Sequence, residues 1–414
     1  MSGRLTRVAA LALLGALLAS PPGLVSCAEE ETRVTEITIG ELGDYTGSAS
    51  HAEAQVHEGF RDYFRMLEEE APIPGVRIRM VNYDTRLDYG RAMPGYVWLK
   101  GQGAILMAVV GGEREILASR FEEDQIPAVG CTGVEAIMGH DWVFNLVAPP
   151  EAQGEAILQW TMDTWDYAGT GRKPKVGHVG WAGLTTTVTY QRGIDRFVAA
   201  NPGKFDSVEA QIAPYGSSAW AVEVSRTMDC DVIVLTAVGP GTASFVREAR
   251  ARGYEGKIVS GIEAFGGFWK LVKDATSPEN LYGCFSARYI PWWNEDVPFI
   301  TEAKEHILEY HSTSRAEELM GATGAMTGWA WAMYTADAIR RAVEEVGAEN
   351  VDGIALRNAL AETDMTLEGW GNPWRFTENN NCLTWAQTMF EWSIAEDDWV
   401  AVSDWYFPPS MPVD

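Results

Sequence analysis

Apolar residues along this chain form short continuous or alternating runs, separated by longer segments with helical spacing. Glu36–Gly40 (EITIG) and Ala104–Val110 (AILMAVV) have the character of strands, whereas Glu53–Glu70 repeats its apolar residues every three or four positions. The alternation continues with strands expected at 76–82, 127–130 and 142–146 and helices at 88–100 and 113–124. Strands that alternate with helices in this way predict a doubly wound α/β lobe.

The same alternation begins again after Ala148-Pro149-Pro150, which we interpret as a hinge. Beyond it we expect helices at 151–166, 190–200, 219–226 and 242–252, and strands at 175–179, 207–212, 231–237 and 257–260. After Leu281 the pattern changes to aromatic, strand-like pieces, with helices at 297–310, 324–346 and near 354–361 and a Trp-rich end. Since single cores stop growing at about 250–300 residues, a chain of 414 residues is expected to form two lobes.

The N-terminal residues lie outside this pattern. Two arginines precede Val8–Ala19, an apolar run with the charge and length of an export signal and too short to remain a membrane span. Leu24-Val25-Ser26-Cys27 then resembles a bacterial lipobox, in which Cys27 becomes the lipid-modified first residue of the mature chain. Ordinary signal cleavage with an unmodified Cys27 is the alternative. We expect a signal peptide over residues 1–27, an acidic tether over 28–35, and a location in the periplasm or at the cell surface.

The composition narrows the classes of function. With 58 acidic and 32 basic residues the net charge is −26, which repels phosphate backbones and argues against a nucleic-acid partner. Neither a nucleophile elbow, a metalloprotease motif, a phosphate-binding loop nor a dinucleotide fingerprint occurs, so we expect no enzymatic activity, no cofactor and no metal. The remaining cysteines can pair in three ways or stay free, and their spacing does not decide between these: Cys131, Cys230, Cys284 and Cys382.

A lone acid follows one βαβ unit of the second lobe. Asp231–Ala237 and Lys257–Ser260 are its expected strands, Val238-Gly239-Pro240-Gly241 ends the first of them, and Glu263 comes just after the second. Ligands bind at the carboxyl ends of the strands in open parallel sheets, so a carboxylate here is placed to hold a small cation such as an ammonium group. A solvated loop position is the alternative that the local sequence leaves open.

These features, in order, resemble the type I periplasmic solute-binding proteins of ABC importers, and specifically the branched-chain amino acid (Leu/Ile/Val) binding group. The resemblance runs from Ile37 to about Ala401. It rests on the order and spacing of short motifs: Ile39-Gly40 to Thr46-Gly47, Glu58-Gly59, Asp84, Val110-Gly111-Gly112, Ile126-Pro127, Arg247-Glu248-Ala249-Arg250 with Gly253, and Gly261-Ile262-Glu263.

The resemblance implies two Rossmann-like lobes that are joined by a multi-strand hinge and close over a solute. Lobe 1 is then expected to comprise residues 36–149 plus about 289–365, and lobe 2 residues 150–288 plus about 366–405. The implied role is a solute-binding lipoprotein that delivers an amino acid, or a related amine-bearing molecule, to an ABC permease in the membrane. A ligand-sensing module that reports to a membrane signalling partner is the alternative.

The first-lobe site residues follow from the same resemblance. The loop around Tyr45 and His51-Ala52 is expected to form one wall of the ligand site. Gly111-Gly112 stands where the family usually has small hydroxyl residues for the ligand carboxylate, so only backbone NH donors remain there. Thr132, in the next loop, is a candidate for the missing hydroxyl.

On the second lobe, Thr186 and Val238 occupy positions that are commonly aromatic in the family, which implies a pocket of altered shape. Glu263 matches the acid that contacts the α-ammonium group in amino-acid-binding members. Among the 17 tryptophans, four lie where the chain is expected to return to lobe 1 and the hinge, and they either stack on a ligand or pack in the core: Trp292, Trp293, Trp329 and Trp331.

Overall fold

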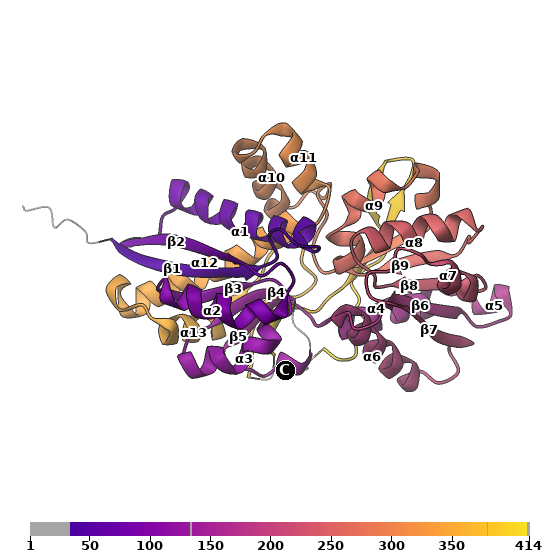
Figure 1. Ribbon diagram of the computed structural model, residues 1–414, viewed down its shortest axis with the longest axis horizontal. Coiled ribbons are helices and arrows are strands. Elements are labelled where there is room, and N and C mark those ends of the chain that lie inside the picture. The colour runs from indigo at the N-terminus through magenta and orange to yellow at the C-terminus, as the bar shows by residue number, and fades with distance from the viewer. Residues whose placement is uncertain (1–33, 133–134, 379, 412–414) are drawn as a thin grey trace, which may run out of the picture. The chain divides into compact units, whose positions relative to one another are not determined.

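The computed structural model describes residues 34–411 apart from 133–134 and 379. The expected signal peptide, Cys27 and all but the last two residues of the expected tether lie outside the described residues, and so does the side chain of Thr132. Within the described chain, helices flank two separate sheets (Figure 1).

The first sheet forms lobe 1 and has six strands in the order β13-β5-β4-β3-β1-β2, all paired in parallel. Its strands are β1 (Thr35–Gly43), β2 (Val76–Asp84), β3 (Ala104–Val109), β4 (Ala128–Thr132), β5 (Val143–Val147) and β13 (Cys382–Thr384). The helices of this half are α1 (Ser50–Glu70), η1 (Tyr89–Arg91), α2 (Ala92–Gly101), α3 (Glu113–Asp124), η2 (Glu135–Ile137), α10 (Pro298–Tyr310), α11 (Thr313–Met320), α12 (Gly324–Val346), η5 (Ala348–Asn350) and α13 (Gly353–Ala361).

The second sheet forms lobe 2 and has seven strands in the order β15-β14-β10-β9-β8-β6-β7, of which β14 runs antiparallel to both its neighbours. Its strands are β6 (Lys175–Trp181), β7 (Ser207–Ala213), β8 (Val232–Leu235), β9 (Lys257–Ser260), β10 (Cys284–Arg288), β14 (Thr388–Ser393) and β15 (Asp398–Ala401). Its helices are α4 (Pro150–Thr164), α5 (Tyr167–Thr170), α6 (Thr185–Ala200), α7 (Ala221–Thr227), α8 (Pro240–Ala251), the π-helical turn η3 (Ile262–Gly266), α9 (Trp269–Ala275) and η4 (Pro278–Leu281).

The chain crosses between the two sheets three times: after β5, after β10, and between β13 and β14. This confirms the expected fold of two doubly wound α/β lobes joined by several strands. The third crossing comes later than the expected boundary at 366, because β13 pairs with β5 (Cys382↔Asn145) and so belongs to the first sheet. A small hairpin of β11 (Asp364–Met365) and β12 (Trp374–Arg375) precedes that crossing.

Glycines allow helices α1 and α12 to pack with their backbones in contact. A Cβ atom on Gly59 would overlap the carbonyl of Ala325, and one on Gly328 would overlap the carbonyl of Val56. This close approach fixes the N-terminal turn of α1 beside the N-terminus of α12. Both helix starts face the cavity described below, so the packing positions part of its wall.

The four tryptophans considered above pack in the core. Trp329 stacks beside His306 and meets the edge of Tyr63, with a ring-centroid distance of 5.3 Å for the tyrosine. Trp331 packs on Phe60 at 4.5 Å. Trp292 and Trp293 are also buried, and neither lies among the residues that line the cavity.

Two further features bear on function. Cys131, Cys230, Cys284 and Cys382 are all free thiols. Over the described residues, none of the helices has the length and apolar character that crossing a membrane requires.

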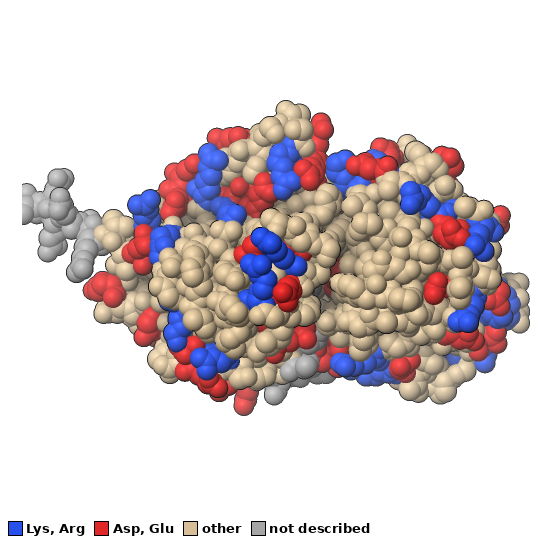
Figure 2. All heavy atoms as spheres, in the orientation of Figure 1, with Lys and Arg blue, Asp and Glu red and all other residues tan. Residues whose placement is uncertain are grey.

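On the face shown in Figure 2, charged side chains of both signs lie mainly toward the edges, and much of the middle is uncharged.

Candidate ligand-binding site

A cavity of about 410 Å³ lies where the carboxyl ends of strands from both lobes meet. Its lobe 1 wall comes from the segments after β1, β2 and β3, from Cys131 within β4, and from the first turns of α1 and α12. Its lobe 2 wall comes from the end of β6 and from the segments after β6, β7, β8 and β9. Small-molecule sites typically measure about 300–1,000 Å³, so the cavity is large enough for a small solute.

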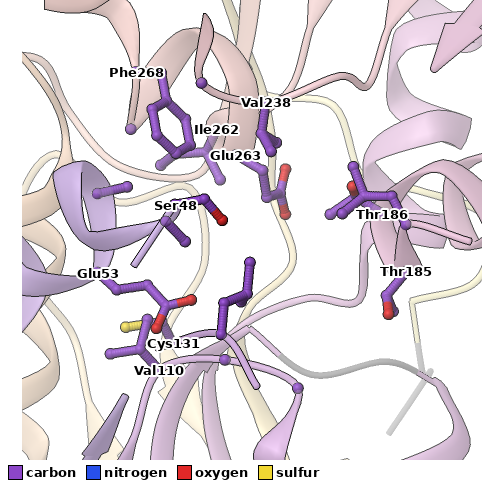
Figure 3. A pocket seen from close by; sticks show the side chains of 18 of the residues that line it. Ser48, Glu53, Val110, Cys131, Thr185, Thr186, Val238, Ile262, Glu263 and Phe268 are labelled. Atoms are coloured by element: carbon purple, nitrogen blue, oxygen red, sulfur yellow. The ribbon is translucent and has the colours of Figure 1, made fainter. Parts of the chain in front are cut away.

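Glutamates supply all the charge on the described lining of this cavity. Glu53 comes from α1 and Glu263 from η3, and Figure 3 shows their carboxylates entering the same space from different lobes. Glu115 adds a third carboxylate from α3, but its side chain is exposed. Lysine, arginine and histidine are absent from the described lining residues. The site is therefore electrostatically suited to a cation.

Aromatic rings supply much of the remaining surface. Trp181 is the last residue of β6, and its indole passes so close to Gly241 that a Cβ atom there would overlap the ring. Tyr215 lies 5.6 Å from Trp181 between ring centroids, and Phe268 and Tyr89 also line the cavity. Thr186 and Val238 also line the cavity, and the aromatic surface that these two positions do not supply comes from the other residues named here.

Glu263 is held in place by two residues of lobe 2. Gln153 Nε2 donates a hydrogen bond to Glu263 Oε1 at 2.8 Å. The Tyr190 hydroxyl lies 3.1 Å from Glu263 Oε2 and 2.9 Å from Gln153 Oε1, so its one proton can serve either acceptor. A carboxylate offers about four acceptor sites, which leaves capacity for a ligand NH group. Burial raises the pKa of Glu263 above its ordinary value, and the hydrogen bonds from Gln153 and Tyr190 partly offset that rise.

Gly261 makes this arrangement possible. A Cβ atom at this position would overlap both the Tyr190 hydroxyl and Gln153 Oε1, and would lie 3.0 Å from Glu263 Oε2. The absence of a side chain therefore lets all three polar groups converge at the end of β9.

On the opposite wall, Glu53 lies beside a second buried carboxylate, that of Glu113. A Cβ atom built on Gly111 would lie 3.2 Å from Glu53 Oε1 and 2.5 Å from Glu113 Oε2, so the two acids flank this glycine. Glu53 Oε2 accepts a hydrogen bond from the Asp44 backbone NH at 2.8 Å, and Glu113 Oε1 accepts one from Thr85 at 2.7 Å. Burial, reinforced by the charge of Glu113, raises the pKa of Glu53 to about 8.

Gly111 and Gly112 line the cavity, whereas two other expected site residues turn away from it. Asp84 accepts a hydrogen bond from the Tyr45 backbone NH at 3.0 Å, and the Tyr45 ring stacks on His57 at 4.9 Å instead of entering the cavity. His51 lies at the rim, where its ring stacks at 6.4 Å on Phe268 of lobe 2. The expected wall is still present, because Ser48, Ala49 and Ala52 of the same segment line the cavity.

Arg114 does not reach the cavity lining. It is fully buried behind the wall, where its guanidinium donates to Asn145 and, at 3.5 Å, to the Val110 carbonyl.

Cys131 lines the cavity, but burial raises the pKa of its thiol to about 12, so it is a poor nucleophile. Within the described residues, His, Cys, Asp and Glu side chains form no group of three or more that would hold a metal ion.

Sequence reasoning does not single out Glu53, Tyr89, Tyr215 or Phe268. Acids are common in the first turn of any helix because the helix dipole favours them there, so Glu53 carries no distinctive signal. Its one indication is its position, shortly after the carboxyl end of β1. The aromatic residues lie in loops whose path is set by tertiary contacts.

Comparison with known proteins identifies the fold and the family. A family model described as periplasmic binding protein matches residues 36–397. Comparison with curated protein sequences gave no significant match.

Solved structures are similar over nearly the whole chain. One is a branched-chain amino acid ABC transporter protein from Thermus thermophilus with bound valine, at TM-score 0.78 and 16% identity, covering 91% of this chain and 97% of that one. Another is a fatty acid ABC transporter substrate-binding protein from Thermomonospora curvata, at TM-score 0.75 and 19% identity, covering 91% and 93%. A third is an ABC transporter solute-binding protein from R. palustris in complex with benzoate, at TM-score 0.72 and 15% identity, covering 91% and 98%.

Proposed function

We propose that this chain, which belongs to the periplasmic binding protein family, is the extracytoplasmic solute-binding component of an ABC importer and captures a small amine-bearing solute. The family match over residues 36–397 supports the binding role, and the similar structures named as ABC transporter proteins support the link to a permease. Specificity for an amine comes from the cavity of this chain itself.

Glu263 is the observation that carries the proposal for an amine. Its carboxylate enters the cavity, and Gln153 and Tyr190 hold it there while leaving acceptor capacity open. An ammonium group can donate charge-assisted hydrogen bonds to such an acceptor, and these are about twice as strong as neutral ones. A bound cation also compensates the cost of keeping this carboxylate ionised in a buried position.

Closure of the lobes follows from the position of the cavity. Its lining residues come from both lobes, so a ligand makes its full set of contacts only when both walls surround it. A ligand shifts the population toward the state that it binds better, which here is the closed one. The permease can then distinguish loaded from empty protein by the relative position of the lobes.

The mature chain without residues 1–27 can be screened by thermal shift against primary amines, amino acids, neutral amides and carboxylic acids. A ligand at 100 times its dissociation constant adds about 2.7 kcal/mol of stability, which is readily detected. We expect primary amino groups to be required and Glu263→Gln to weaken the response, while Glu209→Gln on the exposed edge of β7 leaves it unchanged. Stabilisation by neutral or purely anionic ligands alone would refute the proposal.

The lipid anchor is a separate part of the proposal and rests on the sequence around Cys27. Expression of the full chain in a bacterium with labelled fatty acid should give a labelled, membrane-associated protein. Cys27→Ala should abolish the label, since this change removes the modified thiol. An unlabelled wild-type protein would contradict lipidation and leave the binding role unaffected.

A further inference from the structure

Gly111 lies beside the carboxylates of Glu53 and Glu113, and these two acids determine which ligand groups the lobe 1 wall can bind. Glu113 is fully buried, and its Oε2 atom has no hydrogen-bond partner. Because a Cβ atom on Gly111 would lie 2.5 Å from that oxygen, a hydroxyl-bearing residue does not fit here unless Glu113 moves. Residue 111 therefore offers no side-chain hydroxyl to a ligand, and the carboxylates of Glu53 and Glu113 lie on either side of it.

None of the described lining residues is a basic side chain that could neutralise Glu53 and Glu113 from within the cavity. Arg114 is the nearest in sequence, but its guanidinium is committed to Asn145 and to the Val110 carbonyl behind the wall. A ligand carboxylate at the lobe 1 wall would therefore lie near the acidic pair of Glu53 and Glu113, with no basic side chain among the described lining residues to offset the negative charge of that pair. Juxtaposed like charges in a site of this kind are strongly unfavourable.

We propose that the cavity selects a small organic amine that carries no carboxylate, and that the pair of Glu53 and Glu113 excludes carboxylate-bearing ligands. This inference rests on the proposed function, because it assumes that Glu263 receives the amine. The aromatic surface formed by Trp181, Tyr215 and Phe268 then accommodates the apolar body of the ligand and adds cation–π attraction for its charged end. Amino acids, which carry a carboxylate beside the amine, are discriminated against.

Protonation of Glu53 provides a second signature of the same site. With a pKa of about 8, Glu53 is largely protonated at neutral pH in the empty cavity, and the negative charge of Glu113, which helps to raise that pKa, remains at the wall. A bound cation favours its ionised form, so binding releases a proton, whereas a bound carboxylate favours the protonated form and takes one up. The titratable and charged groups that act on Glu53 or are acted on by it are Glu113 and Arg114 of α3, Asp44 and Tyr45 of the loop after β1, Tyr89 of η1, and Cys131 of β4.

Matched ligand series test the exclusion of carboxylates. Isothermal titration compares leucine, leucinamide and isopentylamine, then phenylalanine, phenylalaninamide and phenethylamine, and then lysine and cadaverine. In at least one series we expect the amine or amide to bind at least about 100-fold more tightly than the amino acid, the size of effect that unfavourable charge pairs produce. Amino acids that bind as tightly as their decarboxylated partners would overturn the inference while leaving an amine-binding function intact. Failure of every amine to bind would overturn the proposed function as well.

The pH dependence of binding gives an independent readout with the opposite sign for the two ligand classes. For a simple alkylamine, which stays charged up to about pH 10, we expect affinity to rise about tenfold from pH 6 to pH 7 and to level off above about pH 8. Titrations in buffers of different ionisation enthalpy should show proton release. Glu53→Gln should remove the part of the pH dependence of affinity that comes from Glu53, and it should also reduce the affinity for the amine. Any pH dependence that remains then comes from the other glutamates of the cavity. An affinity that falls with rising pH, or a slope unchanged in Glu53→Gln, would refute the role of Glu53.

Discussion

Replacing Glu53 by Gln should make the empty protein more stable at alkaline pH while weakening its binding of amines. The side chain has a pKa of about 8 in the folded protein against 4.5 for an unperturbed glutamate. Glutamine has nearly the same shape, and its oxygen can still accept the hydrogen bond from the Asp44 backbone NH. It carries no charge to be buried beside Glu113, so the substitution removes the cost of ionisation and little else.

The sign and size of the effect follow from proton linkage. Because the pKa is raised in the folded state, the folded protein holds a proton that the unfolded chain releases, and stability is lost as pH rises from about 4.5 to about 8. Each pKa unit corresponds to about 1.4 kcal/mol, so the full window amounts to about 3–5 kcal/mol after allowing for relaxation around the buried pair. The variant should match the wild type near pH 5 and exceed its free energy of unfolding by that amount at pH 9.

Urea unfolding of both proteins at pH 5, 7 and 9, followed by tryptophan fluorescence and by far-ultraviolet circular dichroism, measures this difference. Glu151, whose pKa is raised to about 7 mainly by burial, adds a loss of stability to both proteins and cancels in the comparison. Glu345→Gln, at an exposed position near the end of α12, is the matched control and should change little at any pH. A difference between Glu53→Gln and wild type that stays constant from pH 5 to pH 9 would refute the reasoning.

Two further substitutions test the packing and the support of the site. Gly328→Ala should reduce the free energy of unfolding by at least about 2 kcal/mol, because its Cβ atom would overlap the Val56 carbonyl, while Gly101→Ala, with no atom within 4 Å of its Cβ position, should be neutral or gain up to about 1 kcal/mol in urea unfolding. Equal effects at the two glycines would contradict the close contact of α1 with α12. Tyr190→Phe should weaken amine binding about three- to tenfold at pH 7, with partial recovery at pH 9, since losing the hydroxyl raises the pKa of Glu263 further. A calorimetric affinity for phenethylamine that is the same as in wild type at both pH values would show that Tyr190 does not position this carboxylate.

The alternation of strands and helices was sufficient to predict the fold. A long periodic helix such as α1, expected at Glu53–Glu70 and observed at Ser50–Glu70, is predicted to within a few residues, because one buried face imposes a clear 3.6-residue period. The pattern missed α11 (Thr313–Met320), a short helix with few buried positions. It also misplaced the third crossing, because the pairing of β13 with β5 joins residues more than 200 positions apart and leaves no local trace.

The site was only partly accessible from the sequence. Glu263 follows a strand whose carboxyl end is identifiable from the sequence, and the side chain lines the cavity, while its role in binding stays a prediction. Tyr45 and His51 lie in a segment that does form a wall, but hydrogen bonds to Asp84 and stacking on His57 and Phe268 decide where their rings point. Side-chain direction in such loops depends on residues that are distant in sequence, and the same holds for the placement of Glu53 and Glu113 on either side of Gly111.

A crystal structure of the mature chain with the tightest-binding primary amine of the matched series is the most direct test of amine recognition. We expect the ligand nitrogen to lie at about 2.7–3.0 Å from a carboxylate oxygen of Glu263, with the ligand body between Trp181 and Phe268 and both lobes in contact with it. A ligand nitrogen that points away from Glu263, or a ligand bound outside this cavity, would contradict the account.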